Sequence, residues 1–251
     1  LSILIRAQSR SGLPLLIGTC GTFGNDAAVD WMRDIALEIA CEHDLHPCIA
    51  VLYSEQQPSL MSAKARAGRI TPLAPMTDAD PALFDKCEHI VALMGPEPYI
   101  AALDAGADIV LGGRTTDTAV LAAVPLMRGA GVGPSWHAAK IAECGGLCAT
   151  NPREGGVMMR VGQDAFEIEP LSESNSCTPR TVSAHMLYEN SDPFQLIEPG
   201  GILDVTDARY VAVDDRVVGV TGSRFLQRPY TMKLEGASTG AFQTLMLIGI
   251  L

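Results

Sequence analysis

Apolar and polar positions follow a regular order along the first 150 residues. Apolar residues spaced three and four apart predict helices over residues 1–12, 25–44, 95–106, 115–130 and 135–146. Short apolar runs that end in glycine or polar residues predict strands over residues 13–21, 46–55, 89–95 and 107–113. Residues 64–73 are expected to form a loop with a short extended piece. Because strands that alternate with helices favour βαβ units, we predict an α/β protein with a mostly parallel, Rossmann-like sheet and helices on both faces.

Beyond about residue 150 the pattern contains more strand and less helix. Thr178 as N-cap and Pro179 at the first helical position predict a helix over residues 177–193. Strand candidates are residues 164–171, a hairpin over 209–222 that turns at Asp214 and Asp215, and residues 230–237 and 242–250. We therefore expect an α/β core over residues 1–150 and a mixed α+β extension or second subdomain over residues 151–251. The chain begins without methionine and stops within an apolar run, so we expect it to be truncated at both ends.

The composition predicts a folded, cytoplasmic protein. Of its 251 residues 47% are hydrophobic and 19% are charged, which is typical of a globular domain rather than a disordered chain. The net charge of −11 and the lack of a basic run argue against binding to nucleic acids or an anionic membrane. No apolar run approaches the roughly 20 residues of a membrane span. The seven cysteines are odd in number and scattered, which indicates reduced thiols. Because the chain contains neither a CxxC pair nor an HExxH motif, we expect no metal site.

Two glycine-containing loops follow predicted strands and are expected at the same sheet edge. Gly18, Gly21 and Gly24 precede a helix whose N-terminus can receive an anion, although a tight turn without a ligand explains them equally well. The second loop holds Gly112, Gly113, Arg114 and Thr115, and Asp117 follows in the first turn of a helix. We expect these loops to bind substrate, with Arg114 binding a carboxylate or phosphate and Asp117 holding Arg114. The alternative is a structural Arg114–Asp117 ion pair.

Two further helices carry groups that can transfer protons. His137, Lys140 and Cys144 share one face of the helix over residues 135–146, and Glu143 flanks Lys140. We take Asp117, His137, Lys140 and Glu143 as candidate catalytic residues, with Cys144 as a less favoured nucleophile. The alternative is a partly buried helix with core residues.

The predicted helix over residues 177–193 offers a second set of such groups. His185, Tyr188 and Glu189 share one face of this helix. They form either a site, with Tyr188 and Glu189 contacting substrate, or a structural hydrogen-bond network around the histidine. Because no G-x-S-x-G elbow occurs in the chain, a serine hydrolase of the α/β type is excluded.

The collinear series GADIVLGGRTTDTA, KIAECGG, CTPRTVSAHMLYENSDP, EPGG, RVVGVTGSRF and YTMKLEGA resembles the acyclic terpene utilisation family of AtuA-like proteins. The resemblance begins at IGTCGTFGND and extends over nearly the whole chain. It points to Gly113, Arg114 and Asp117, to Glu143, Cys144 and Gly145, and to Tyr188 and Glu189. The family form GHLLECG has a histidine beside the glutamate–cysteine pair, whereas here Lys140 occupies that place and His137 lies three residues earlier. This departure implies a subgroup with another substrate.

The resemblance implies catabolism of acyclic terpenes through branched acyl-CoA intermediates. We expect an enzyme that acts on a branched or acidic small molecule, with a CoA thioester as a candidate substrate, by a lyase, hydratase or hydrolase step. No cofactor is expected, and we expect the chain to form a homo-oligomer. The alternatives are a non-catalytic subunit of a multi-protein catabolic complex and a module that binds a small acid or a nucleotide.

Overall fold

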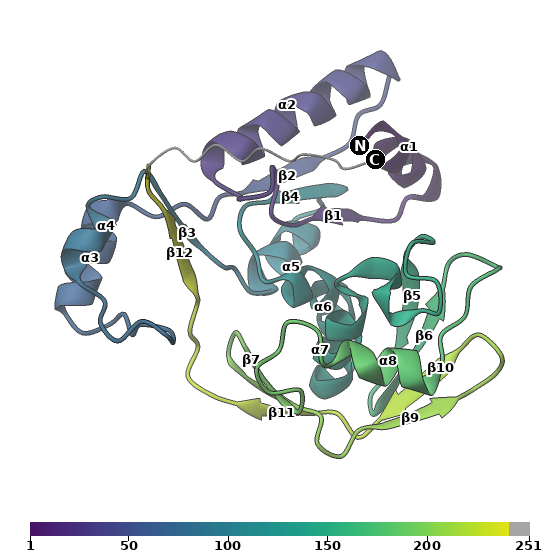
Figure 1. Ribbon diagram of the computed structural model, residues 1–251. Helices are drawn as coiled ribbons and strands as arrows, with labels where there is room; N and C mark the ends of the chain where they lie inside the picture. Colours follow the sequence, from purple (N-terminus) through teal and green to yellow (C-terminus); the bar gives the residue numbers. More distant parts are fainter. Residues whose placement is uncertain (241–251) are drawn as a thin grey trace, which may run out of the picture.

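The computed structural model describes residues 1–240, which form two packed layers joined by central helices (Figure 1). The strand candidate over residues 242–250 lies outside the described residues. The described helices are α1 (Ser2–Ser11), α2 (Asp26–Glu42), α3 (Pro58–Arg66), α4 (Pro81–Phe84), α5 (Glu97–Asp104), α6 (Asp117–Met127), α7 (Val132–Ala142), the 3-10 helix η1 (Gly145–Cys148) and α8 (Pro179–His185). The described strands are β1 (Leu15–Ile17), β2 (Ile49–Leu52), β3 (His89–Ala92), β4 (Ile109–Gly112), β5 (Val157–Val161), β6 (Ala165–Pro170), β7 (Gln195–Glu198), β8 (Gly201–Asp204), β9 (Arg209–Ala212), β10 (Val218–Thr221), β11 (Arg224–Gln227) and β12 (Leu234–Ala237).

The first layer is a parallel sheet of three strands in the order β1-β4-β2. Helices cover both of its faces (Figure 1). Apolar residues of α1 and α2, including Ile5 and Val29, pack with Ile109 and Leu111 on one side. On the other side α5 and α6 pack against the alternate positions of the same strands, among them Val110. The period of two along β4 thus sends successive side chains into two different cores.

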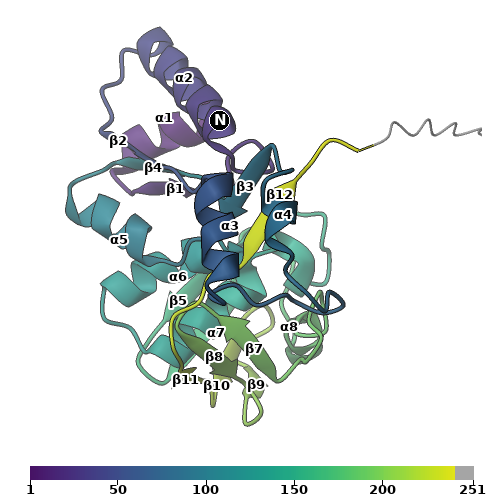
Figure 2. The ribbon, with the colours of Figure 1, turned by 90° about the vertical axis from the view of Figure 1, so that its left-hand side faces the viewer.

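The prediction of a mostly parallel sheet is wrong, because among the described residues only β1, β4 and β2 form a parallel sheet, and one further parallel bridge joins Met94 to Thr115. Strand β3 pairs antiparallel with β12, a segment almost 150 residues later, as Figure 2 shows. Only single bridges, such as Met94 with Thr115, connect the β3 segment to the loops around the parallel sheet. The described strands therefore form a mixed α/β fold and do not establish a Rossmann-like one.

The second layer consists of two antiparallel sheets, with the orders β5-β6-β10-β9 and β11-β8-β7. The predicted hairpin over residues 209–222 is confirmed as β9 and β10, and Asp214 accepts hydrogen bonds from the Arg216 and Val217 amides at its turn. The sequence prediction missed β5, β7, β8 and β11. It also missed α3, which overlaps the start of the loop expected over residues 64–73.

Helix α7 lies in the main hydrophobic core, where all its residues from Gly133 to Ala142 are buried. Its Trp136 stacks on Phe225 of β11, and its Ile141 belongs to the same core cluster as Ile168 of β6. Helix α6 packs on α7 through small residues such as Ala122, while its Ala123 faces the parallel sheet. These two helices therefore connect both layers. Over residues 1–240, no helix combines the length and apolar character needed to cross a bilayer.

Candidate active site

The hairpin of α6 and α7 places Asp117, at the start of one helix, near Glu143, at the end of the other. Thr116 caps α6 by accepting a hydrogen bond from the Ala119 amide, so Asp117 lies in the first turn as predicted. Lys140 donates a hydrogen bond to Oε1 of Glu143, and the two side chains are only 9% and 7% exposed. The structure thus brings together three of the four predicted catalytic residues.

Glu198, at the end of β7, adds a buried carboxyl that the sequence prediction missed. Its Oε2 accepts a 2.8 Å hydrogen bond from Thr118 Oγ1. Burial raises the pKa of Glu198 to about 7, and the negative charges of Glu143 and Asp117 act in the same direction, whereas Thr118 and Lys140 oppose the rise. The quoted EPGG motif contains this residue, but its position in the sequence does not show that the carboxyl lies close to α6 and α7.

Glu143 also holds its proton more tightly than an exposed glutamate. Burial raises the pKa of its carboxyl, the pair with Lys140 lowers it, and the charges of Asp117 and Glu189 raise it further. We refer to Asp117, Glu143, Glu189, Glu198 and Lys140 as the acidic cluster. Four carboxyl groups share this space with one ammonium group, so the cluster favours either a bound proton or a bound cation.

Cys144 and His185 lie beside Glu143, next to the acidic cluster. A ligand atom from each of these three residues lies within 4.8 Å of the others. The His185 side chain is buried, and its Nε2 has no hydrogen-bond partner among the described residues. Burial and the positive charge of Lys140 lower the pKa of His185, which keeps the ring neutral. Burial and the charge of Glu143 raise the pKa of the Cys144 thiol.

Tyr188 and Glu189 reach this region from a loop, because α8 ends at His185 instead of continuing to residue 193 as predicted. The Tyr188 ring stacks on His185 with 5.7 Å between ring centroids. Glu189 has a φ of 56°, in the left-handed region, and its charge acts on both Glu143 and Cys144. Tyr188 is therefore close to the cluster and Glu189 is part of it, although neither residue shares a helical face with His185.

His137 is completely buried, and its ring contacts residues outside the acidic cluster. Its Nδ1 lies 2.8 Å from Ser223 Oγ, and its Nε2 lies 3.1 Å from the Tyr210 hydroxyl. Burial lowers the pKa of His137 to about 3. The structure does not bring this residue together with Asp117, Lys140 and Glu143, and its contacts are those of a core hydrogen-bond network.

Arg114 pairs with Glu235 of β12 and not with Asp117, so the predicted Arg114–Asp117 contact is wrong. Arg114 Nε lies 2.9 Å from Glu235 Oε2, and Lys233 Nζ lies 2.8 Å from Glu235 Oε1. Burial raises the pKa of Glu235, but the hydrogen bonds from Lys233 and Arg114 outweigh it and lower the pKa overall. Antiparallel pairing of β12 with β3 brings Glu235 to this position, which no local pattern in the sequence reveals.

The two glycine loops contact each other directly. The amides of Thr19 and Cys20 donate to the carbonyls of Gly113 and Gly112, and the Arg114 amide donates to the carbonyl of Gly24. Gly24 has a φ of 76°, and a Cβ there would lie 2.4 Å from the Arg114 nitrogen. These amides are therefore occupied by backbone carbonyls, and substrate binding by the loops stays a prediction.

The remaining glycines and Thr115 of these loops have packing roles as well. A Cβ on Gly18 would lie 2.4 Å from Val120, one on Gly21 would lie 2.5 Å from Ala28, and one on Gly113 would lie 2.6 Å from Ser54 Oγ. The Thr115 hydroxyl is buried, 2.9 Å from the hydroxyl of Tyr99. Close approach between the loops and helices α2, α5 and α6 is thus sufficient to explain these residues.

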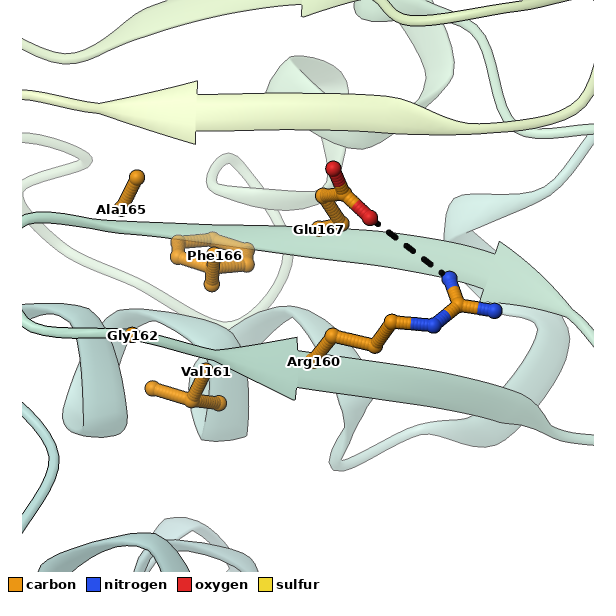
Figure 3. A pocket seen from close by; sticks show the side chains of 6 residues that line it. All are labelled: Arg160, Val161, Gly162, Ala165, Phe166 and Glu167. Atoms are coloured by element: carbon orange, nitrogen blue, oxygen red, sulfur yellow. Dashed lines mark ion pairs between the residues drawn. The ribbon is translucent and has the colours of Figure 1, made fainter.

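A surface depression of about 340 Å³ lies on the β5–β6 hairpin, away from these groups. Arg160 at its edge is 3.6 Å from Glu167, as Figure 3 shows, and 2.6 Å from Glu169. Its charge is therefore already balanced. None of the residues that line the depression belongs to the acidic cluster, which is the stronger candidate for chemistry.

Fold and site together define a mixed α/β protein with an acidic cluster at the ends of two packed helices, in which Lys140 and Glu198 are buried and Asp117 and Glu189 are exposed. The family model described as "Acyclic terpene utilisation family protein AtuA" matches residues 22–149 and 165–251, so the chain belongs to this family. Membership confirms the resemblance seen in the sequence and suggests a role in acyclic terpene utilisation. Searches among curated proteins and among solved structures give no significant match.

Proposed function

We propose that this protein is a catabolic enzyme that adds water to, or removes it from, a branched acyclic chain at the acidic cluster. One observation carries the proposal, namely the convergence of Asp117, Lys140, Glu143 and Glu198 at the ends of α6, α7 and β7. Addition of water to a double bond requires one group that gives a proton and another that takes one. Two carboxyl groups in different environments can divide these tasks.

In the proposed hydration, Glu198 is the acid and Glu143 is the base. Glu198 gives its proton to one carbon of the double bond, while Glu143 takes a proton from a water molecule whose oxygen bonds to the other carbon. With a pKa of about 7, Glu198 carries the proton that this step needs in about half of the molecules at pH 7. Lys140 lowers the pKa of Glu143 against the larger effect of burial, and their hydrogen bond orients the carboxyl that takes the proton. The proton then returns from Glu143 to Glu198 through solvent, and elimination of water follows the reverse order.

The negative charge of the cluster favours an uncharged part of the substrate, so an acidic or CoA-linked end would bind elsewhere. Arg114 is our candidate for that end. Two cationic groups, Arg114 and Lys233, share the single carboxylate of Glu235, so the trio carries a net positive charge. An anion in contact with this trio would meet an exposed part of the guanidinium.

Several features of the protein stay predictions. These are a CoA thioester as the substrate form, a hydrolase step in place of hydration, contacts of Tyr188 and Glu189 with substrate, a homo-oligomer and a cytoplasmic location. The two alternatives, a non-catalytic subunit and a binding module, differ from the proposal in an observable way, because neither would convert a substrate.

Incubation of the protein in D₂O with a panel of unsaturated, branched acyclic acids and their CoA thioesters tests the proposal. We expect mass spectrometry to show a product that has gained one molecule of water with deuterium on carbon. Glu198→Gln should lower this rate by about 100-fold or more, since general acid catalysis contributes on that scale. Glu169→Gln, on β6 outside the cluster, is the matched control and should leave the rate unchanged.

Equal rates for wild type and Glu198→Gln would overturn the assignment of the acid. If the panel raises the melting temperature but no water or deuterium is gained, the chain is a binding module and the enzyme proposal fails.

A further inference from the structure

We propose that Glu143, Cys144 and His185 form a binding site for a zinc-like divalent cation. The three residues come from two segments, the end of α7 and the last residue of α8. They supply the carboxylate oxygen, thiolate sulfur and imidazole nitrogen that protein zinc sites use. Their ligand atoms already lie within 4.8 Å of one another. The site shares Glu143 with the proposed function, but metal binding is measured without any substrate, so the two proposals can fail separately.

His185 gives an independent indication of a ligand at this place. Its side chain is only 5% exposed, and Nε2 has no hydrogen-bond partner among the described residues. A buried polar atom without a partner is unfavourable, so such atoms usually bind water or an ion. Metal coordination would satisfy this nitrogen, while the stacked Tyr188 ring holds the imidazole in orientation.

The surrounding charge favours a cation over a neutral ligand. Asp117, Glu189 and Glu198 carry acidic groups around the site in addition to Glu143, and Lys140 is the cation that opposes them. Lys140 contacts Oε1 of Glu143, so Oε2 is the oxygen assigned to the metal. A bound divalent cation would offset the remaining negative charge of these carboxyl groups.

The geometry requires only a small contraction. Tetrahedral zinc, with bonds of about 2.0–2.3 Å, separates its ligand atoms by roughly 3.5 Å. Closure from separations of at most 4.8 Å demands movements of about 1 Å or less. Sulfur and imidazole ligands select zinc, cobalt or iron over magnesium and calcium, which prefer oxygen alone. Three protein ligands leave the fourth position open for water or substrate, as in catalytic zinc sites.

Titration of the chelator-treated full-length protein with Co²⁺ tests the site without any substrate. We expect one equivalent of Co²⁺ to produce a thiolate-to-cobalt charge-transfer band, which Zn²⁺ then abolishes by displacement. Cys144→Ser should lose the band, and His185→Gln should bind at least tenfold more weakly. Cys41→Ser and His46→Gln change exposed residues of the same types and are the controls, which should behave as wild type.

A second measurement applies if either variant fails to fold. Zn²⁺ should raise the melting temperature of wild type by several degrees more than that of Glu143→Gln. Absence of the band in wild type, an unchanged band in Cys144→Ser, or an equal shift in Glu143→Gln would overturn the site. If the wild-type protein shows the cobalt band but no hydration activity, the result counts only against the proposed function.

Discussion

His137 and Lys140 have different surroundings, although the two residues lie only one helical turn apart. Both are inside the molecule, but His137 meets Ser223 and Tyr210, whereas Lys140 meets Glu143. Helical spacing correctly suggested that Lys140 and Glu143 are neighbours, since residues three apart on a helix contact each other. Spacing could not reveal which sheet covers which side of α7, and therefore could not separate the two environments.

We expect His137 to make stability depend on pH. Its pKa is about 3 in the folded protein against an ordinary value of 6.5, so below pH 6.5 the unfolded chain binds a proton that the folded chain does not. The stabilising effect is present above pH 6.5 and is lost as the pH falls towards 3. Between pH 7.5 and 4.5 the free energy of unfolding should fall by about 2–3 kcal/mol more in wild type than in His137→Gln.

Urea denaturation at a series of pH values measures this difference. His46→Gln, at an exposed histidine, is the control and should keep the wild-type slope. The same slope in His137→Gln and wild type would contradict a neutral, buried His137.

At the scale of elements, the order of the first helices and strands follows from hydrophobic pattern, but several strand partners do not. Helices α2, α5 and α6 begin where their caps and prolines predict. The missed strands β7, β8 and β11 are only four residues long, so periodicity gives little signal for them. The partner of β3 is β12, and pairing over such a sequence separation depends on tertiary packing. For the same reason the sequence could not place Glu198 beside Thr118.

The contact between the two glycine loops predicts a large effect of Gly24→Ala. At this position an alanine would be strained by the positive φ and would also collide with the Arg114 backbone. Gly129 has almost the same φ, 75°, but a Cβ there meets nothing within 4 Å. We expect Gly129→Ala to lower the free energy of unfolding by about 1 kcal/mol and Gly24→Ala by about 3 kcal/mol or more.

Chemical denaturation of both variants measures the two effects. Equal losses would mean that the strain of the positive φ alone matters and that the loops do not pack closely.

At the scale of the whole molecule, α6 and α7 couple the parallel sheet to the antiparallel ones. Ala119 and Ala122 of α6 belong to the core around α7, while Ala123 belongs to the core under the parallel sheet. Because one helix contributes to two cores, loss of either layer exposes apolar surface of the other. The parallel layer and the antiparallel layer of the described residues therefore pack against the same helix pair.

This coupling predicts a single unfolding transition. Trp136 is 2% exposed in the shared core, and Trp31, the other tryptophan, is 61% exposed on α2. In Trp31→Phe, fluorescence reports Trp136 alone, while far-ultraviolet circular dichroism reports all helices. We expect both signals to change at the same urea concentration. Separate transitions would show that the layers unfold independently.

The acidic cluster, and the raised pKa of Glu198 within it, is the centre of the functional proposal. Carbon-13 NMR of protein labelled at the glutamate carboxyl, with metal removed by a chelator, measures this property directly. We predict one resonance that titrates near pH 7, as the pKa of Glu198 requires, and that disappears in Glu198→Gln. Titration of every glutamate around its ordinary value of 4.5 would contradict a buried proton donor at this site.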